Sequence, residues 1–416
     1  MKPIHEISQN WLTNFAVRNG WQRAFNRPFY IFLEVTNRCN LACIMCGRTH
    51  DPRYEIKGHT GDLTLERVKR LDSFYPYATF TIPTGVGEPF INLELVPIIK
   101  YLKSKGTQVS LTSNGTILNK IHSMEMIQCG LDKIIFSIDG ATQQTFERIR
   151  VNARFDTVIG NVARLKELKA QHQSPFPRVE LELVAMACNF HELPAWAELA
   201  KEVGAEALTV QNLFGHSGEA FGDVYDSQKL IHIAYSQGIK IWEEFLDTAR
   251  RLNLQIYSPF LNADMRQHFG PDPVAPERME AGSTPGGDSL SDHADIGAGE
   301  APAADTQAAP PRQAEETKPM YCTQPWSILF MAWNGDIRTC CFNEYALGNI
   351  TENSIEKIWN GPRYRSMRKA VAAGKVMDVC RDCLSSGSNY SIIPELDMSL
   401  PSRHLRAALT RRPRRL

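Results

Sequence analysis

The stretch that decides the fold is Phe29-Tyr-Ile-Phe-Leu-Glu-Val-Thr36, followed at once by Asn37-Arg-Cys39-Asn-Leu-Ala-Cys43-Ile-Met-Cys46. The first half is an apolar run of strand length, and the second is a loop with C-x3-C-x2-C spacing. Three thiolates on one loop can bind three irons of a [4Fe–4S] cluster, which normally takes four cysteine ligands. The fourth iron would then keep an open position, as catalytic metal sites do.

A C-x2-C pair by itself also occurs in zinc knuckles and in redox dithiols. A structural zinc site would need a fourth ligand close by, and His50 is the only local candidate. The three-cysteine spacing favours an iron–sulfur cluster over both alternatives.

With its flanking Glu34-Val-Thr-Asn-Arg38, the loop resembles the cluster loop of radical SAM enzymes. The resemblance implies that Cys39, Cys43 and Cys46 bind a [4Fe–4S] cluster whose open iron chelates S-adenosylmethionine. In that family one electron from the cluster cleaves the sulfonium, and the 5′-deoxyadenosyl radical abstracts a hydrogen from substrate. A one-electron donor such as flavodoxin or ferredoxin is implied as a partner.

Three further segments resemble motifs of the same family, in the family's order: Thr84–Pro89, Leu111–Gly115 and Phe136–Gly140. They correspond to the "GGEP" turn, the "TNG" segment and the "S-x-D-G" segment. The first departs slightly, since Gly85-Val86-Gly87 replaces the usual Gly-Gly. The cofactor-binding residues implied by the resemblance are Gly87, Glu88, Pro89, Ser113, Asn114, Ser137 and Asp139.

Short apolar runs alternate with amphipathic helical patterns along the first 265 residues. The predicted strands cover residues 30–36, 80–84, 108–112, 133–138, 179–186 and 207–212. A long helix is expected over residues 228–251. This alternation predicts an α/β fold, and the family layout is a partial (β/α)6 TIM-like barrel of parallel strands. All four motifs then fall at carboxyl ends of strands, where barrel active sites lie.

A second cysteine set begins at Cys322 and follows the pattern C-x12-G-x4-C, a gap of 39 residues, then C-x2-C. It resembles the auxiliary-cluster domains called SPASM and, in shortened form, twitch. The resemblance implies one auxiliary [4Fe–4S] cluster in a small α+β domain, with Cys341 as an alternative to the second ligand. A four-thiolate structural zinc is the competing interpretation. The implied ligands are Cys322, Cys340, Cys380 and Cys383.

The composition shifts to Ala, Pro, Gly, Ser, Asp and Glu between Gly270 and Thr317, which predicts a flexible linker rather than a substrate lid. The expected organisation is therefore a helical extension (1–28), the barrel (29–265), the low-complexity linker (266–319), the auxiliary-cluster domain (320–395) and a basic tail (396–416).

The formal net charge is zero, with 46 basic and 46 acidic residues, so no global field indicates DNA binding. No run approaches the ~20 apolar residues of a membrane span, and the N-terminus lacks a secretory pattern. A cytoplasmic protein is expected. Cys129 and Cys188 stand apart from both cysteine sets and are expected to be buried thiols. Arg150 is expected to be solvated.

A fully ligated auxiliary cluster can accept one electron from a product radical, which would make the reaction a two-electron oxidation. The favoured function is therefore radical oxidation of a small molecule such as a sugar, a cyclitol or a lipid head group, as in twitch-type dehydrogenases. A radical SAM enzyme that modifies a ribosomal peptide is the second hypothesis, and a non-enzymatic iron–sulfur electron carrier is the third. No catalytic acid or base can be named from the sequence.

Overall fold

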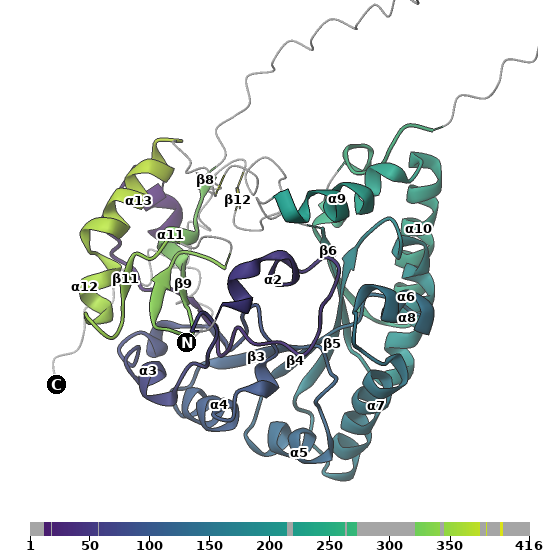
Figure 1. Cartoon of the computed structure of the whole chain (residues 1–416), viewed down its shortest axis with the longest axis horizontal. Coiled ribbons are helices and arrows are strands. Elements are labelled where there is room, and N and C mark those ends of the chain that lie inside the picture. The colour runs from purple at the N-terminus through teal and green to yellow at the C-terminus, as the bar shows by residue number, and fades with distance from the viewer. Residues whose placement is uncertain are drawn as a thin grey trace, which may run out of the picture. The chain divides into compact units, whose positions relative to one another are not determined.

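Apolar runs of the sequence form the strands of one large sheet in a computed structural model (Figure 1). The structure describes residues 12–17, 19–56, 58–213, 219–262, 264–272, 321–341, 345–374, 380 and 392–393. Within these residues the sheet has ten strands, in the order β11-β10-β9-β1-β2-β3-β4-β5-β6-β7.

Seven of these strands run parallel and pair in sequence order, as a barrel requires. The six predicted strands are confirmed, and a seventh, β7, follows them. Their buried residues, such as Ile31, Leu111 and Leu183, point to the interior that helices and sheet share. The strands are β1 (Tyr30–Leu33), β2 (Phe80–Ile82), β3 (Gln108–Ser113), β4 (Lys133–Ser137), β5 (Arg178–Ala185), β6 (Ala207–Asn212) and β7 (Gln255–Tyr257).

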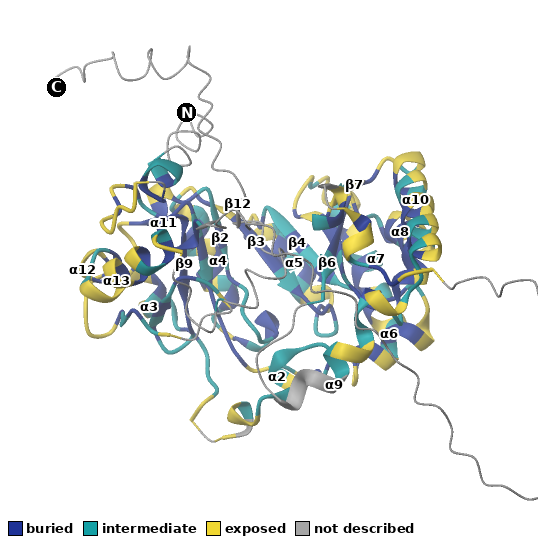
Figure 2. Cartoon of the chain, turned by 90° about the horizontal axis from the view of Figure 1, so that it is seen from above, coloured by how far each residue is buried: buried dark blue, intermediate teal, exposed yellow. Residues whose placement is uncertain are grey.

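Helices cover the outer face of this curved sheet, with their buried side turned to the strands and their exposed side outward (Figures 1 and 2). On α4, for example, Ile98, Ile99 and Leu102 are fully buried. The helices are α3 (Leu65–Lys69), α4 (Leu95–Ser104), α5 (Lys120–Gln128), α6 (Gln143–Ile149), α7 (Phe155–Gln171), α8 (Leu193–Val203) and α10 (Tyr235–Arg251).

The expectation of one helix over residues 228–251 is wrong. Helix α9 (Glu219–Gln228) ends at Gln228, a 3-10 turn follows, and α10 begins only at Tyr235. The interruption has a tertiary cause, because Gly270 donates to the Ile233 carbonyl (2.9 Å) and accepts from the Tyr235 amide (2.9 Å). This extended pairing replaces one turn of helix.

The C-terminal strands extend the barrel's sheet beyond β1. Strand β9 (Ile328–Met331) lies parallel to β1, with Leu33 opposite Met331, and turns through Trp333–Gly335 into antiparallel β10 (Asp336–Arg338). The predicted hairpin is therefore present, and the small C-terminal domain shares a sheet with the barrel. Its remaining elements are α11 (Gln324–Ser327), β11 (Gly348–Asn349), α12 (Ile355–Trp359), α13 (Pro362–Ala372) and the pair β8 (Tyr321–Cys322) and β12 (Ile392–Ile393).

Residues up to Pro271 and from Pro319 onward belong to one compact unit. Most of the predicted linker and the whole basic tail lie outside the described residues, whereas residues 12–17 of the predicted N-terminal extension are helical. None of the helices within the described ranges is long and apolar enough to span a membrane.

Candidate active site

The first cysteine loop connects β1 to a short helix, α2 (Gly47–His50), which lies in the opening of the curved sheet (Figure 1). Two backbone hydrogen bonds hold the loop: the Ala42 amide donates to the Val151 carbonyl (3.1 Å) and the Ile44 amide to the Ile149 carbonyl (3.0 Å). Ile149 is the last residue of α6, and Val151 follows it. The loop is thus fixed by the segment that follows the fourth motif.

The thiols of this loop are withdrawn from water. Cys43 is buried, whereas Cys39 and Cys46 are half-buried. Burial raises the pKa of Cys39 and raises the pKa of Cys43 to about 12, although Arg150 opposes the latter shift. Without metal these two thiols therefore keep their protons at neutral pH, and metal binding must release them.

The loop fits a cluster better than a single zinc ion. The His50 Nε2 atom lies 2.7 Å from the Ile44 carbonyl oxygen, so the ring is already engaged with the loop backbone. In the part of the chain that the structure describes, no three His, Cys, Asp or Glu side chains converge on one ion-sized point. Zinc gathers its ligands ~2.3 Å from one centre, whereas a four-iron cluster binds each thiolate to a different iron.

The Gly-Glu-Pro turn packs directly against the start of this loop. A Cβ atom at Gly87 would lie 2.5 Å from the carbonyl oxygens of Thr36 and Arg38, so only glycine fits there. The Glu88 amide donates to the same Arg38 carbonyl (2.8 Å). Pro89 then opens a 3-10 turn over Pro89–Ile91. Contact between the turn and the cysteine loop is thus made through the backbone.

The Glu88 carboxylate joins the second motif to the third. It is 2% exposed and accepts hydrogen bonds from the Ser113 hydroxyl (2.8 Å) and the Asn114 amide (2.8 Å). Burial raises the pKa of Glu88 to about 7 despite these donors. Asn114 continues the chain of contacts, since its Nδ2 lies 3.0 Å from Asn40 Oδ1 and 3.9 Å from the Cys39 sulfur.

Arg150 is not solvated, which corrects the expectation from its place beside a helix. The residue follows the last turn of α6, where a φ of −98° and a ψ of 71° leave the helical path. It is 8% exposed, forms an ion pair with Asp139 (2.6 Å), and places Nη1 3.9 Å from the Cys43 sulfur. Burial alone would lower the pKa of Arg150, but Asp139 and Cys43 raise it.

Asp139 is fully buried, so an uncompensated charge there would be costly. Its Oδ1 accepts from the Val184 amide (2.7 Å), and its pKa is raised by burial, an effect that Arg150 opposes. Ser137 ends β4 opposite Glu182 of β5. The need for a cation beside Asp139 is the signal that could have identified Arg150 from the sequence.

The second cysteine set is described only in part. Cys322 lies on β8, which packs against α13, and Cys340 follows β10 close enough to Tyr364 of α13 to influence its pKa. Cys380 is half-buried, and Cys383 lies outside the described residues. Two of the four implied ligands thus border the same helix. Apart from these sets, Cys129 is buried as expected, whereas Cys188 is half-buried, which corrects the expectation of a second buried thiol.

Two family models match the chain. Residues 33–175 match the radical SAM superfamily, and residues 322–384 match SPASM, an iron–sulfur cluster-binding domain. The chain carries a radical SAM domain and a SPASM domain. S-adenosylmethionine, a [4Fe–4S] cluster and auxiliary iron–sulfur binding come with these domains. The predicted family and cofactors are confirmed.

Similar proteins carry several different names. A tungsten-containing aldehyde ferredoxin oxidoreductase cofactor-modifying protein from Pyrococcus furiosus is 28% identical over 205 residues, covering 47% of this chain and 55% of that protein. A GTP 3′,8-cyclase from Desulforamulus reducens is 29% identical over 188 residues, covering 43% and 54%. This radical SAM chain therefore spans about half the length of the curated relatives it matches.

Solved structures support the fold of the radical SAM and SPASM parts. SuiB from Streptococcus suis bound to S-adenosylmethionine aligns with a TM-score of 0.55 at 12% identity, covering 82% of this chain and 68% of that chain. SuiB has also been solved with its precursor peptide SuiA. At this identity the likeness establishes architecture and leaves the substrate open.

Proposed function

We propose that this protein uses S-adenosylmethionine to abstract a hydrogen atom from a small molecule such as a sugar, a cyclitol or a lipid head group. The reaction would finish as a two-electron oxidation with the help of an auxiliary cluster. One observation carries the proposal: three withdrawn thiols, the Gly-Glu-Pro turn and the Asp139–Arg150 pair are joined by direct contacts at the carboxyl ends of parallel strands.

Each residue of this group has a role that its contacts support. Cys39, Cys43 and Cys46 would bind the cluster that, when present, supplies the electron for cleaving S-adenosylmethionine to a hydrogen-abstracting radical. Arg150 places a buried positive charge beside the Cys43 sulfur and so favours its thiolate form. Because the Ser113 hydroxyl and the Asn114 backbone amide donate hydrogen bonds to its carboxylate, Glu88 acts as a positioning residue for the loop.

The SPASM part would hold one further four-iron cluster through Cys322, Cys340, Cys380 and Cys383. Cys341 is exposed whereas Cys340 is half-buried, which favours Cys340 as the ligand. Four thiolate ligands leave no open iron, so this group serves for electron transfer. An external one-electron donor such as flavodoxin or ferredoxin would start each turnover.

Peptide modification is the alternative, and the likeness to SuiB, which has been solved with a precursor peptide, is the observation that favours it. A small molecule remains the first proposal because the second cysteine set resembles the shortened, twitch-type pattern of dehydrogenases that act on small molecules. Substrate assays with both classes would separate the two.

The test is anaerobic reconstitution of the full chain, followed by reduction with S-adenosylmethionine present. We expect about eight irons per chain from two four-iron clusters, and formation of 5′-deoxyadenosine measured by chromatography. Cys43→Ala should lose about half of the iron and all cleavage. Cys129→Ala is the matched control, since Cys129 is a buried thiol outside both sets and should keep iron and cleavage. Intact iron without 5′-deoxyadenosine would refute the enzymatic proposal.

A further inference from the structure

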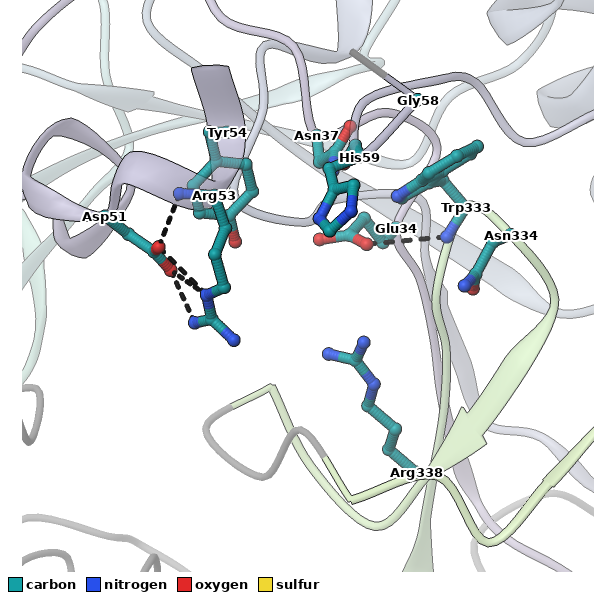
Figure 3. A pocket seen from close by; sticks show the side chains of 10 residues that line it. All are labelled: Glu34, Asn37, Asp51, Arg53, Tyr54, Gly58, His59, Trp333, Asn334 and Arg338. Atoms are coloured by element: carbon teal, nitrogen blue, oxygen red, sulfur yellow. Dashed lines mark hydrogen bonds and ion pairs between the residues drawn. The ribbon is translucent and has the colours of Figure 1, made fainter. Parts of the chain in front are cut away.

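A cavity of about 370 Å³ lies between the segment that follows the first cysteine loop and the hairpin of the SPASM part (Figure 3). Glu34 and Asn37 are its buried residues, and Trp333 and Asn334 line it from the hairpin turn. The volume suits a small ligand. None of the residues implied in S-adenosylmethionine binding lines this cavity, so it offers space for a different molecule.

Both sides of the cavity are fixed by specific contacts. The Asn37 side chain donates to the His59 carbonyl (2.8 Å) and accepts from the Gly61 amide (2.9 Å), which ties the later segment to the cysteine loop. The Trp333 ring packs over Gly61, where a Cβ atom would lie 2.3 Å from the ring. The Trp333 amide in turn donates to Glu34 (3.4 Å). The cavity is therefore built by the fold.

Arg338 enters this cavity from β10, with its guanidinium pointing toward Glu34 and His59 (Figure 3). Within the described ranges its guanidinium forms no hydrogen bond or ion pair, and its Nε is shielded from solvent. The neighbouring Arg53 is paired with Asp51 instead. Arg338 is half-buried, and a guanidinium whose Nε is shielded and without a partner can gain hydrogen bonds from an anionic ligand.

We propose that Arg338 binds a carboxylate group of the substrate in this cavity. The proposal rests on the proposed function and specifies its substrate class: a small polar molecule that carries one carboxylate. The planar guanidinium pairs with a carboxylate through two parallel hydrogen bonds. The Glu34 carboxylate at the floor disfavours a doubly charged phosphate and can accept a hydrogen bond from a hydroxyl or ammonium group of the same ligand.

The position of the cavity suits a substrate of both cysteine sets. Asn37 precedes Cys39 by two residues, and Arg338 precedes Cys340 by two residues. A molecule held between these two side chains is bordered by the segments that lead into the two implied clusters. Hydrogen abstraction and electron removal would then act on one bound molecule without its release.

The test uses the reconstituted full chain with S-adenosylmethionine under anaerobic conditions, and saturation-transfer NMR with three probes. D-glucuronate carries a carboxylate, D-glucose is the neutral counterpart, and glucose 6-phosphate carries a phosphate. We expect binding in the order glucuronate, glucose 6-phosphate, glucose. Arg338→Gln should weaken glucuronate binding at least about 10-fold, which corresponds to the loss of charged hydrogen bonds.

Arg250→Gln is the matched control, because Arg250 lies exposed on the outer helix α10 and should leave binding unchanged. Arg338→Lys keeps the charge without the fork and should bind to an intermediate extent, which guards against a folding defect in Arg338→Gln. No glucuronate binding by the wild type, equal binding of glucose, binding that survives Arg338→Gln, or tighter binding of glucose 6-phosphate would each overturn the carboxylate assignment.

The proposed function is measured separately in the same samples. Formation of 5′-deoxyadenosine from S-adenosylmethionine is compared between the wild type and Arg250→Gln, which should have equal rates because Arg250 lies exposed outside the site. A wild type that binds glucuronate through Arg338 but makes no 5′-deoxyadenosine would refute the function and leave the binding site standing.

Discussion

The buried ion pair between Arg150 and Asp139 gives the most direct test of the site. Arg150→Met keeps an unbranched side chain but removes the guanidinium. The fully buried Asp139 carboxylate then has only the Val184 amide as a described partner. Breaking a buried pair from one side costs about 3–5 kcal/mol. We expect that loss in the free energy of unfolding of the metal-free chain at pH 8.

Acid should relieve the loss, because Asp139 can take up a proton once its counter-charge is gone. Each pH unit below its new pKa recovers up to about 1.4 kcal/mol. The double variant Arg150→Met/Asp139→Asn should be more stable than Arg150→Met alone, since it removes the stranded charge as well. The wild type, Arg150→Met, Asp139→Asn and the double variant form a double-mutant cycle, in which we expect a coupling energy of about 1–3 kcal/mol.

Urea unfolding followed by tryptophan fluorescence at pH 8 and pH 6 measures these quantities. Arg250→Met serves as the control, because its pair with Asp247 is exposed on both sides and should contribute under 1 kcal/mol. Additive losses in the cycle, or a loss below about 1 kcal/mol for Arg150→Met, would show that the pair does not stabilise the loop as described.

Three further outcomes are expected. Gly87→Ala must displace the backbone at Thr36 and Arg38, so it should lower the free energy of unfolding by about 1–3 kcal/mol and reduce iron binding at the first loop. Gly160→Ala, in open space on α7, should instead raise the free energy of unfolding by up to about 1 kcal/mol, and equal unfolding midpoints of the two variants would contradict this. Burial raises the pKa of Glu88 to about 7, so the folded chain binds this proton more tightly than the unfolded chain, and the free energy of unfolding should fall as the pH rises from about 4.5 to 7. Glu88→Gln should make this pH dependence weaker in urea titrations, and an unchanged pH dependence would disprove the raised pKa of Glu88. Met331→Ala removes a fully buried side chain from β9 and should lower the free energy of unfolding by about 2–5 kcal/mol. The barrel and the SPASM part should still unfold in one calorimetric transition, and two separate transitions would argue against the shared sheet.

Local pattern was sufficient for the barrel and insufficient where distant segments meet. The apolar runs that became β1 to β6 are buried or half-buried along almost their whole length, and such runs predict parallel strands well. The helix expected over residues 228–251 failed because Gly270, nearly 20 residues past its end, pairs with Ile233 and Tyr235. The hydrophobic periodicity of residues 228–251 contains no information about this contact with Gly270.

The same limit applies to the site. Glu88, Asn114 and Asp139 were predicted because they belong to strand-end motifs, whereas Arg150 follows a helix and could be inferred only from the need of Asp139 for a cation. The run Ile328-Leu-Phe-Met331 is uninterrupted and fully buried, which is typical of an internal parallel strand, yet its partner β1 lies about 300 residues earlier. The local sequence pattern predicts the strand but does not identify a partner at that distance along the chain.

The β1–β9 pairing also has a consequence for biosynthesis. The first strand of the barrel emerges from the ribosome early, but its outer edge is covered only when Ile328–Met331 has been made. A ribosome adds about 5–20 residues per second, so the edge next to the first cysteine loop stays unpaired for tens of seconds. During that interval the edge of β1 can pair with other chains. Synthesis of β9 then removes this edge.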